Sequence, residues 1–208
     1  MRVLSGGVLG LGLLAGCAAG GGGGAPVRIT LELFEFDAGH ARAAELALAG
    51  GESPRGIPGG VTAVLWTPGF RASFRQESGR FPSRRTSLQS IRVAEGGEGL
   101  LQAVEHPSAA FDLPVPGGGG AVLTGAGVAL RPVRRADGAV ELEVTPWFQV
   151  LRGPTLRAPP DRSVRLAVPR GWAAALVASA PDEPFAAALL FASTPRGLRR
   201  TIAVLSAE

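Results

Sequence analysis

The chain has 208 residues, of which 46% are hydrophobic and 18% charged, with a formal net charge of +4. This apolar fraction is enough for the core of one domain, whereas 31 glycines and 17 prolines favour short strands and turns over long helices. Every basic residue is arginine and only one cysteine is present, which excludes a disulfide within the chain.

The N-terminus has the order of an export signal. Arg2 precedes an apolar run from Val3 to Leu14, which is too short to remain as a stable membrane span. Small residues then precede Cys17 in the tetrapeptide Leu-Ala-Gly-Cys, and five glycines follow shortly after it. An ordinary secretory signal, cleaved a few residues later, would leave a soluble periplasmic or extracellular protein and is one interpretation.

The same tetrapeptide resembles the lipobox of bacterial lipoproteins. The resemblance implies a signal peptide over residues 1–16, acylation of Cys17 with palmitate-type chains, and a Gly-rich tether over residues 17–26. More than one acyl chain gives lasting membrane attachment, because each buried methylene contributes about 0.8 kcal/mol. Ala18 after the cysteine favours the outer membrane, with the protein facing the periplasm. For such an exported protein we expect no nucleic-acid partner.

Residues 27–208 are predicted to form one mainly β, antiparallel domain with at most one or two short helices. Its first strand begins at Val27, and Val27, Ile29, Leu31 and Leu33 share one face. The alternation changes parity at Phe34, which predicts a β-bulge before the strand ends near Asp37. A short helix is expected within Ala38–Ala49, followed by a turn-rich segment from Gly50 to Gly60.

The middle of the chain predicts two strand pairs. Val61–Thr67 and Phe70–Gln76 flank Pro-Gly, a dipeptide that is typical of tight turns. Ser87–Ala94 and Gly99–Val104 flank a Glu-Gly-Gly-Glu turn, and a flexible loop is expected over Pro107–Gly120.

The second half predicts further hairpins and the strands that close the sheet. Gly127–Arg134 and Ala139–Leu151 flank Asp-Gly, a strong hairpin signal. Ser163–Val168 and Trp172–Ser179 flank Pro-Arg-Gly and predict another hairpin. Two further strands are expected in the C-terminal segments Phe185–Ala192 and Leu198–Leu205.

Apolar runs and tryptophans in these strands indicate packing. Trp172–Val177 and Phe185–Phe191 are apolar at almost every position, so they face a second layer or lie in a membrane or subunit contact. Trp66, Trp147 and Trp172 are interpreted as core or sheet-face side chains, with a ligand-stacking platform as the alternative.

Residues for catalysis or metal binding are sparse. His40 and His106 are the only histidines, and with Cys17 assigned to lipid no zinc site, cofactor site or catalytic residue is predicted. No phosphate-binding loop or Gly-x-Ser-x-Gly motif is present. A dispersed triad with Asp37, His40 and a serine, as in a lipoprotein hydrolase, remains an alternative.

Acidic and basic side chains are interpreted as solvated. Glu32 falls on the polar face of the first strand, and Glu35 and Asp37 fall at its end, so paired acid–base carboxylates are the less favoured interpretation. Arginine pairs are likewise interpreted as solvated strand ends, with a phosphate or lipopolysaccharide contact as the alternative.

Five segments, taken in order, resemble the C-terminal domain of secretins, the outer-membrane channels of type II and III secretion, type IV pili and filamentous phage export. They are Leu31–Asp37 (LELFEFD), Leu88–Gly99 (LQSIRVAEGGEG), Thr124–Pro132 (TGAGVALRP), Asp137–Pro146 (DGAVELEVTP) and Val164–Val177. The sequence lacks the preceding ring-forming repeats, the Gly-Gly-Leu motif and the segment that leads to the inner gate. The resemblance implies a secretin-like β domain, without implying a pore.

Two functions follow from these observations. The first is a structural or accessory lipoprotein of an export or pilus system, which associates with itself or with other secretion proteins. The second is a periplasmic β-sandwich lipoprotein that binds a ligand, peptidoglycan or another envelope protein. The first requires exposed strand edges that pair between subunits, whereas the second requires protected edges and a pocket.

Overall fold

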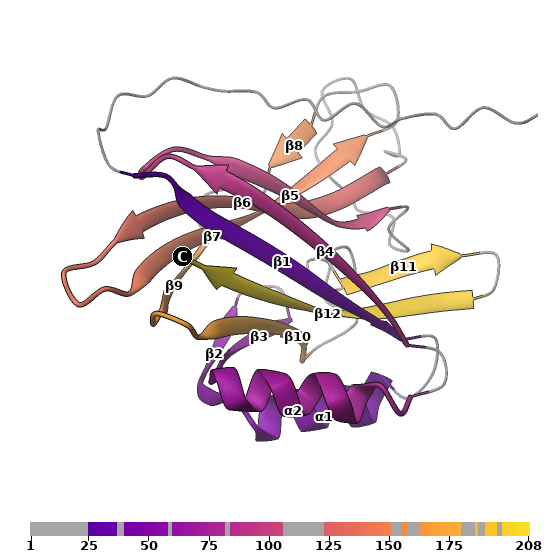
Figure 1. Ribbon diagram of the computed structural model, residues 1–208. Coiled ribbons are helices and arrows are strands. Elements are labelled where there is room, and N and C mark those ends of the chain that lie inside the picture. The colour runs from indigo at the N-terminus through magenta and orange to yellow at the C-terminus, as the bar shows by residue number, and fades with distance from the viewer. Residues whose placement is uncertain are drawn as a thin grey trace, which may run out of the picture.

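The computed structural model is mainly β, as the sequence predicts, and the strands and helices of its described part form two antiparallel sheets with two short helices, α1 and α2 (Figure 1). It describes residues 25–36, 40–57, 60–81, 84–105, 123–150, 155–157, 163–179, 186, 190–194 and 197–208. Cys17, Asp37, His106 and the predicted loop at 107–120 lie outside the described residues, as do residues 1–24 with the expected signal peptide.

The larger sheet, sheet A, contains seven strands in the order β2-β3-β10-β12-β1-β4, with β11 also paired to β12. Its strands are β1 (Val27–Phe36), β2 (Glu52–Ile57), β3 (Val61–Trp66), β4 (Arg84–Val93), β10 (Ala173–Ala178), β11 (Phe191–Thr194) and β12 (Gly197–Ala207). The central strands β1 and β12 pair from Ile29 opposite Ala207 to Phe36 opposite Arg200.

The smaller sheet, sheet B, contains five strands in the order β5-β6-β7-β8, with β9 also paired to β7. Its strands are β5 (Gly99–Glu105), β6 (Leu123–Arg134), β7 (Val140–Val150), β8 (Thr155–Arg157) and β9 (Val164–Val168). The β6–β7 hairpin is confirmed, and Gly138 in its turn has a φ of 81°, which glycine adopts without strain.

The two sheets pack face to face and enclose the main hydrophobic core. Sheet A contributes alternate residues of β1 together with Ala174, Leu176, Ala203 and Leu205, all buried. Sheet B contributes Val128, Leu130, Leu142, Val144 and Leu166. The architecture of the domain is therefore a β-sandwich.

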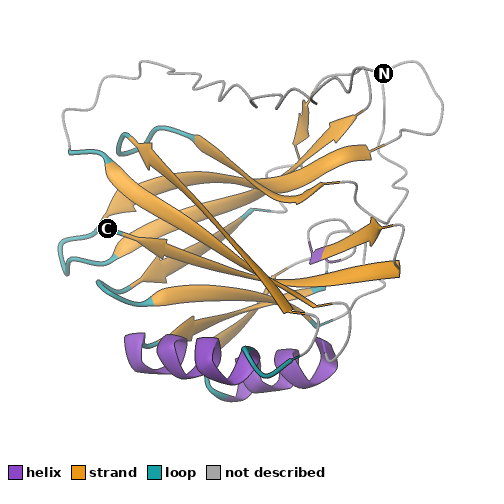
Figure 2. Ribbon diagram, turned by 45° about the vertical axis from the view of Figure 1, so that its right-hand side comes forward, coloured by secondary structure: helices purple, strands orange, loops and turns teal. Residues whose placement is uncertain are grey.

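Both helices, α1 (His40–Ala49) and α2 (Pro68–Ser78), cover the other face of sheet A (Figure 2). A second buried cluster lies between them and the sheet and includes Phe34, Phe36, Trp66 and Phe74. Sheet A is thus the middle of three layers. This explains why β10 is apolar at every position, since both of its faces are covered.

The bulge predicted at Phe34 is absent. β1 pairs with β4 and with β12 in a continuous register through this residue. Phe34 and Phe36 instead follow the ordinary alternation and face the helices, while Leu31 and Leu33 face sheet B. The apolar residues change parity at Phe34 because, from there on, the strand also packs its other face, against the helices.

The segment Phe70–Gln76 is helical, so the strand predicted there is wrong. Thr67 is the N-cap of α2, and its side-chain oxygen accepts a hydrogen bond from the backbone N–H of Phe70 at 3.1 Å. Pro68 follows in the first turn, where its missing N–H costs nothing. The Pro-Gly dipeptide therefore starts a helix, and the predicted turn-rich segment after Ala49 contains strand β2.

Two predicted hairpins are divided between the sheets. β4 pairs with β1 in sheet A, whereas β5 pairs with β6 in sheet B. Likewise β9 pairs with β7, whereas β10 pairs with β3 and β12. Both turns therefore carry the chain from one sheet to the other. The last strand, β12, is confirmed. The strand predicted over Phe185–Ala192 is wrong over its first part, because Ala186 and Leu190 are helical and β11 begins only at Phe191.

Candidate functional site

Three cross-strand pairs lie on the helix-side face of β1 and β4, next to helix α2. They are Arg28 opposite Arg92, Thr30 opposite Ser90, and Glu32 opposite Leu88. We call these six residues the β1–β4 face. The pairs are successive, because every second residue of a strand points to the same side.

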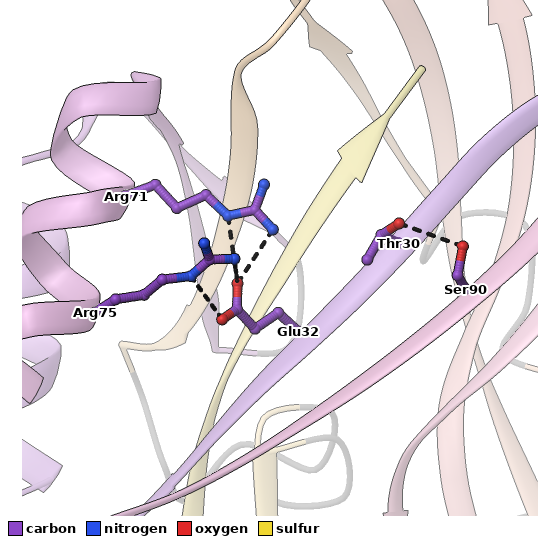
Figure 3. A network of polar contacts seen from close by, with 5 residues as sticks. All are labelled: Thr30, Glu32, Arg71, Arg75 and Ser90. Atoms are coloured by element: carbon purple, nitrogen blue, oxygen red, sulfur yellow. Dashed lines mark hydrogen bonds and ion pairs between the residues drawn. The ribbon is translucent and has the colours of Figure 1, made fainter. Parts of the chain in front are cut away.

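Glu32 is the buried charge of this face. Its carboxylate accepts hydrogen bonds from Arg75 Nε and Nη2 at 2.8 and 2.6 Å, and from Arg71 Nε and Nη2 at 3.3 and 3.1 Å (Figure 3). The residue is only 4% exposed. The prediction that Glu32 is solvated is therefore wrong, because α2, which was not predicted, covers it.

This geometry makes Glu32 a structural anchor for α2. Hydrogen bonding to Glu32 raises the pKa of Arg75, against the lowering effect of burial, and the charge of Glu32 raises it further. Four donated hydrogen bonds occupy the carboxylate, so it is poorly placed to act as a general base.

The rest of the β1–β4 face is accessible. Thr30 and Ser90 are joined by a hydroxyl contact of 3.4 Å, and Arg28 and Arg92 are both exposed on directly opposite positions. Like charges in such a pair are destabilising. Leu88 is 65% exposed, the largest value among the exposed large hydrophobic side chains of the described residues. The face combines positive charge with one apolar side chain.

Strand β4 is also the end strand of sheet A. Among the described strands it pairs only with β1, over ten residues and without a register shift. On its inner side, the Gln89 side-chain amide donates to the Gln102 carbonyl at 2.7 Å and accepts from the Gln102 N–H at 3.3 Å. Gln89 thereby holds β4 to the edge of β5 in the other sheet.

A second candidate site is an apolar groove of about 170 Å³ between the two sheets. It lies at the β2 end of sheet A, which is the end opposite β4. Its lining comes from β2, β3 and β9 and consists of Ser53, Arg55, Ala63, Val64, Leu65, Leu166 and Ala167. The register of β2 shifts between Glu52 and Arg55, and Ser53 in this bulge has a φ of 50°. A left-handed serine costs on the order of 1–3 kcal/mol.

The tryptophans serve packing. Trp66 is fully buried and donates to the Ala47 carbonyl at 3.0 Å. Trp147 lies against the open face of Gly127 and donates to the Leu101 carbonyl at 3.2 Å. Trp172 is partly buried against the inter-sheet core. These contacts agree with the packing interpretation of all three.

Other candidate residues from the sequence do not come together among the described residues. His40 begins α1, and Glu35 is partly buried on β1 and has a polar or ionic interaction of its own. Among the described residues, no three histidine, cysteine, aspartate or glutamate side chains are grouped as a metal site. Sequence reasoning missed Arg71 and Arg75, although their i, i+4 spacing parallels that of Phe70 and Phe74 and is a helix signal.

Comparison with protein-family models, curated proteins and solved structures finds no match for this chain. Within the described ranges, no helix has both the length and the apolar character needed to cross a membrane. The β1–β4 face, the edge of β4 and the groove are therefore the features from which function is argued.

Proposed function

We propose that this chain is a non-enzymatic lipoprotein, anchored to the outer membrane through acylated Cys17 and facing the periplasm. It acts as a structural or accessory component of a secretion or pilus-type export system. In this role its β-sandwich associates with further copies of itself by pairing at the β4 edge. The lipobox at Cys17 and the five secretin-like segments support this function.

The observation that carries the proposal is the long, regular edge of β4, which itself carries the exposed side chain of Leu88. Monomeric β proteins blunt such edges with short strands, charged side chains, prolines or bulges. β4 has ten residues in continuous register with β1, and its arginines (Arg84, Arg85 and Arg92) stand at its two ends. The residues between them, from Thr86 to Ile91, are uncharged and include Leu88, which is 65% exposed. A strand of another copy could extend sheet A here by backbone hydrogen bonds.

The tether length is compatible with such assembly at a membrane. Ten residues, 17–26, separate the acylated cysteine from the start of β1. A flexible Gly-rich chain of this length has a root-mean-square span of roughly 17 Å. Such a span would keep the sandwich close to the bilayer.

A second candidate function is a lipoprotein that binds a small ligand as a monomer. It is favoured by the apolar groove between β2, β3 and β9, since ligand sites are concave and mostly apolar with a few polar groups. Both functions share the lipid anchor and differ in the surface that is used.

The anchor is tested by intact mass and fractionation of the protein from a bacterial host. We expect the mature chain to begin at an acylated Cys17 and to sediment with outer membranes. A Cys17→Ser variant should retain its signal peptide and lose the acyl mass. Recovery of an unmodified wild-type chain from the soluble periplasm would contradict the proposal.

A further inference from the structure

The groove between β2, β3 and β9 has an apolar floor. Ala63 and Leu166 are buried, and Leu65 and Ala167 are partly buried, so aliphatic side chains of both sheets line it. An apolar cavity of about 150 Å³ can accept a benzene-sized ligand. The 170 Å³ of this groove therefore fits a hydrocarbon segment of roughly six carbons.

The rim of the groove is polar and carries a cation. Ser53 and Arg55 contribute to the lining, and both are exposed on β2. Among the described residues, Arg55 forms no ion pair. A guanidinium beside an apolar slot is complementary to a carboxylate that bears an alkyl chain.

The irregular backbone of β2 shapes this rim. Ser53 and Pro54 fall in the register shift between Glu52 and Arg55 and stand against the single residue Val64, so β2 has one extra residue relative to β3. Bulges of this kind occur next to binding sites, where they redirect a side chain, and a strained residue at such a place favours a functional role.

We propose that the groove binds a linear monocarboxylate with a medium-length alkyl chain. The chain packs on Ala63, Leu65 and Leu166, and the carboxylate pairs with Arg55 beside the Ser53 hydroxyl. This site lies at the β2 end of sheet A, at the opposite end of the strand order from the β4 edge. The inference is therefore independent of self-association.

The test is a titration of the full-length chain with octanoate, followed by methyl NMR. We expect saturable shifts at Ala63, Leu65, Leu166 and Ala167, and none at Leu46, which lines a separate groove between the two helices. Octanol has the same chain length without the charge and should bind about two- to fivefold more weakly. Butanoate, four methylenes shorter, should bind more than tenfold more weakly.

Two variants localise the binding. Arg55→Gln should weaken octanoate binding by about two- to fivefold and leave octanol binding unchanged, whereas Arg42→Gln, an exposed arginine on α1, should leave both unchanged. Ala167→Phe should fill the groove and abolish the shifts. Absence of saturable shifts at the lining methyls, equal affinity for octanoate and octanol, or equal shifts at Leu46 would overturn the proposal.

Discussion

At the scale of single residues, Glu32 is the charge on which the helical layer depends. It is buried, and two arginines of α2 satisfy it. Glu32→Gln removes the charge and leaves both guanidinium groups beside a neutral amide. We expect the free energy of unfolding in urea to fall by about 1–3 kcal/mol, less than for a fully buried pair because Arg75 is 47% exposed.

The matched control is Glu45→Gln, an exposed carboxylate on α1, which should change stability by less than about 0.5 kcal/mol. Arg75 imposes no alkaline limit on stability below its ordinary pKa. The pKa of Arg75 is raised, so its contribution is complete below the ordinary arginine pKa and is lost only in stronger alkali. Equal unfolding midpoints for the two variants would show that the network does not hold α2.

Gly127 is a second position where one atom matters. A Cβ there would lie 2.1 Å from the Leu101 carbonyl oxygen and 2.8 Å from the Trp147 ring. Gly127→Ala should therefore lower the melting temperature by several degrees, because the indole and the β5 backbone must move. Gly56→Ala in β2, where a Cβ meets nothing within 4 Å, is the control and should be neutral or slightly stabilising. A neutral Gly127→Ala would contradict the packing of Trp147.

At the scale of elements, helix α2 shows where local signals mislead. Pro-Gly is typical of turns, and the apolar residues around it suggested a strand pair. The helix is specified instead by the cap at Thr67 and by Phe70 and Phe74, which pack against Trp66 with ring centroids 5.3 and 4.6 Å away. The i, i+4 spacing of these phenylalanines is in the sequence, whereas the apolar surface that receives them is visible only in the fold.

The cap predicts a measurable cost. Thr67→Ala removes the acceptor for the Phe70 N–H and should destabilise the protein by about 1 kcal/mol in urea unfolding. Ser73→Ala, on an exposed position inside the same helix, should be neutral or stabilising, because alanine is the better helix former. If both substitutions had the same effect, Thr67 would not be acting as a cap.

At the scale of the whole molecule, strand positions could be predicted more reliably than strand partners. Alternation is local, so it predicts the positions of β1, β3, β4, β5, β6, β7, β9, β10 and β12. The partners of β4, β5, β9 and β10 depend on which sheet each strand joins. That choice follows from long-range packing, such as the layer of helices on sheet A, and a short turn between two strands does not decide it.

The same limit applies to the candidate sites. The acylation of Cys17 stays a prediction, and it can be made from the sequence because export signals are read as linear sequence. The Glu32 network joins β1 to α2, and the groove joins β2 and β3 to β9, so each needs segments that are distant in the sequence. The β1–β4 face likewise exists only because β4 returns antiparallel to β1.

Self-association at the β4 edge is the central claim, and light scattering of the full-length lipidated protein in mild detergent tests it most directly. We predict a mass that is a multiple of the monomer for the wild type and a monomer for Leu88→Lys, because a charge at an edge strand opposes pairing. Val133→Lys, which changes an exposed valine of sheet B, should keep the wild-type mass. A wild-type monomer, or equal masses for the two lysine variants, would contradict the claim.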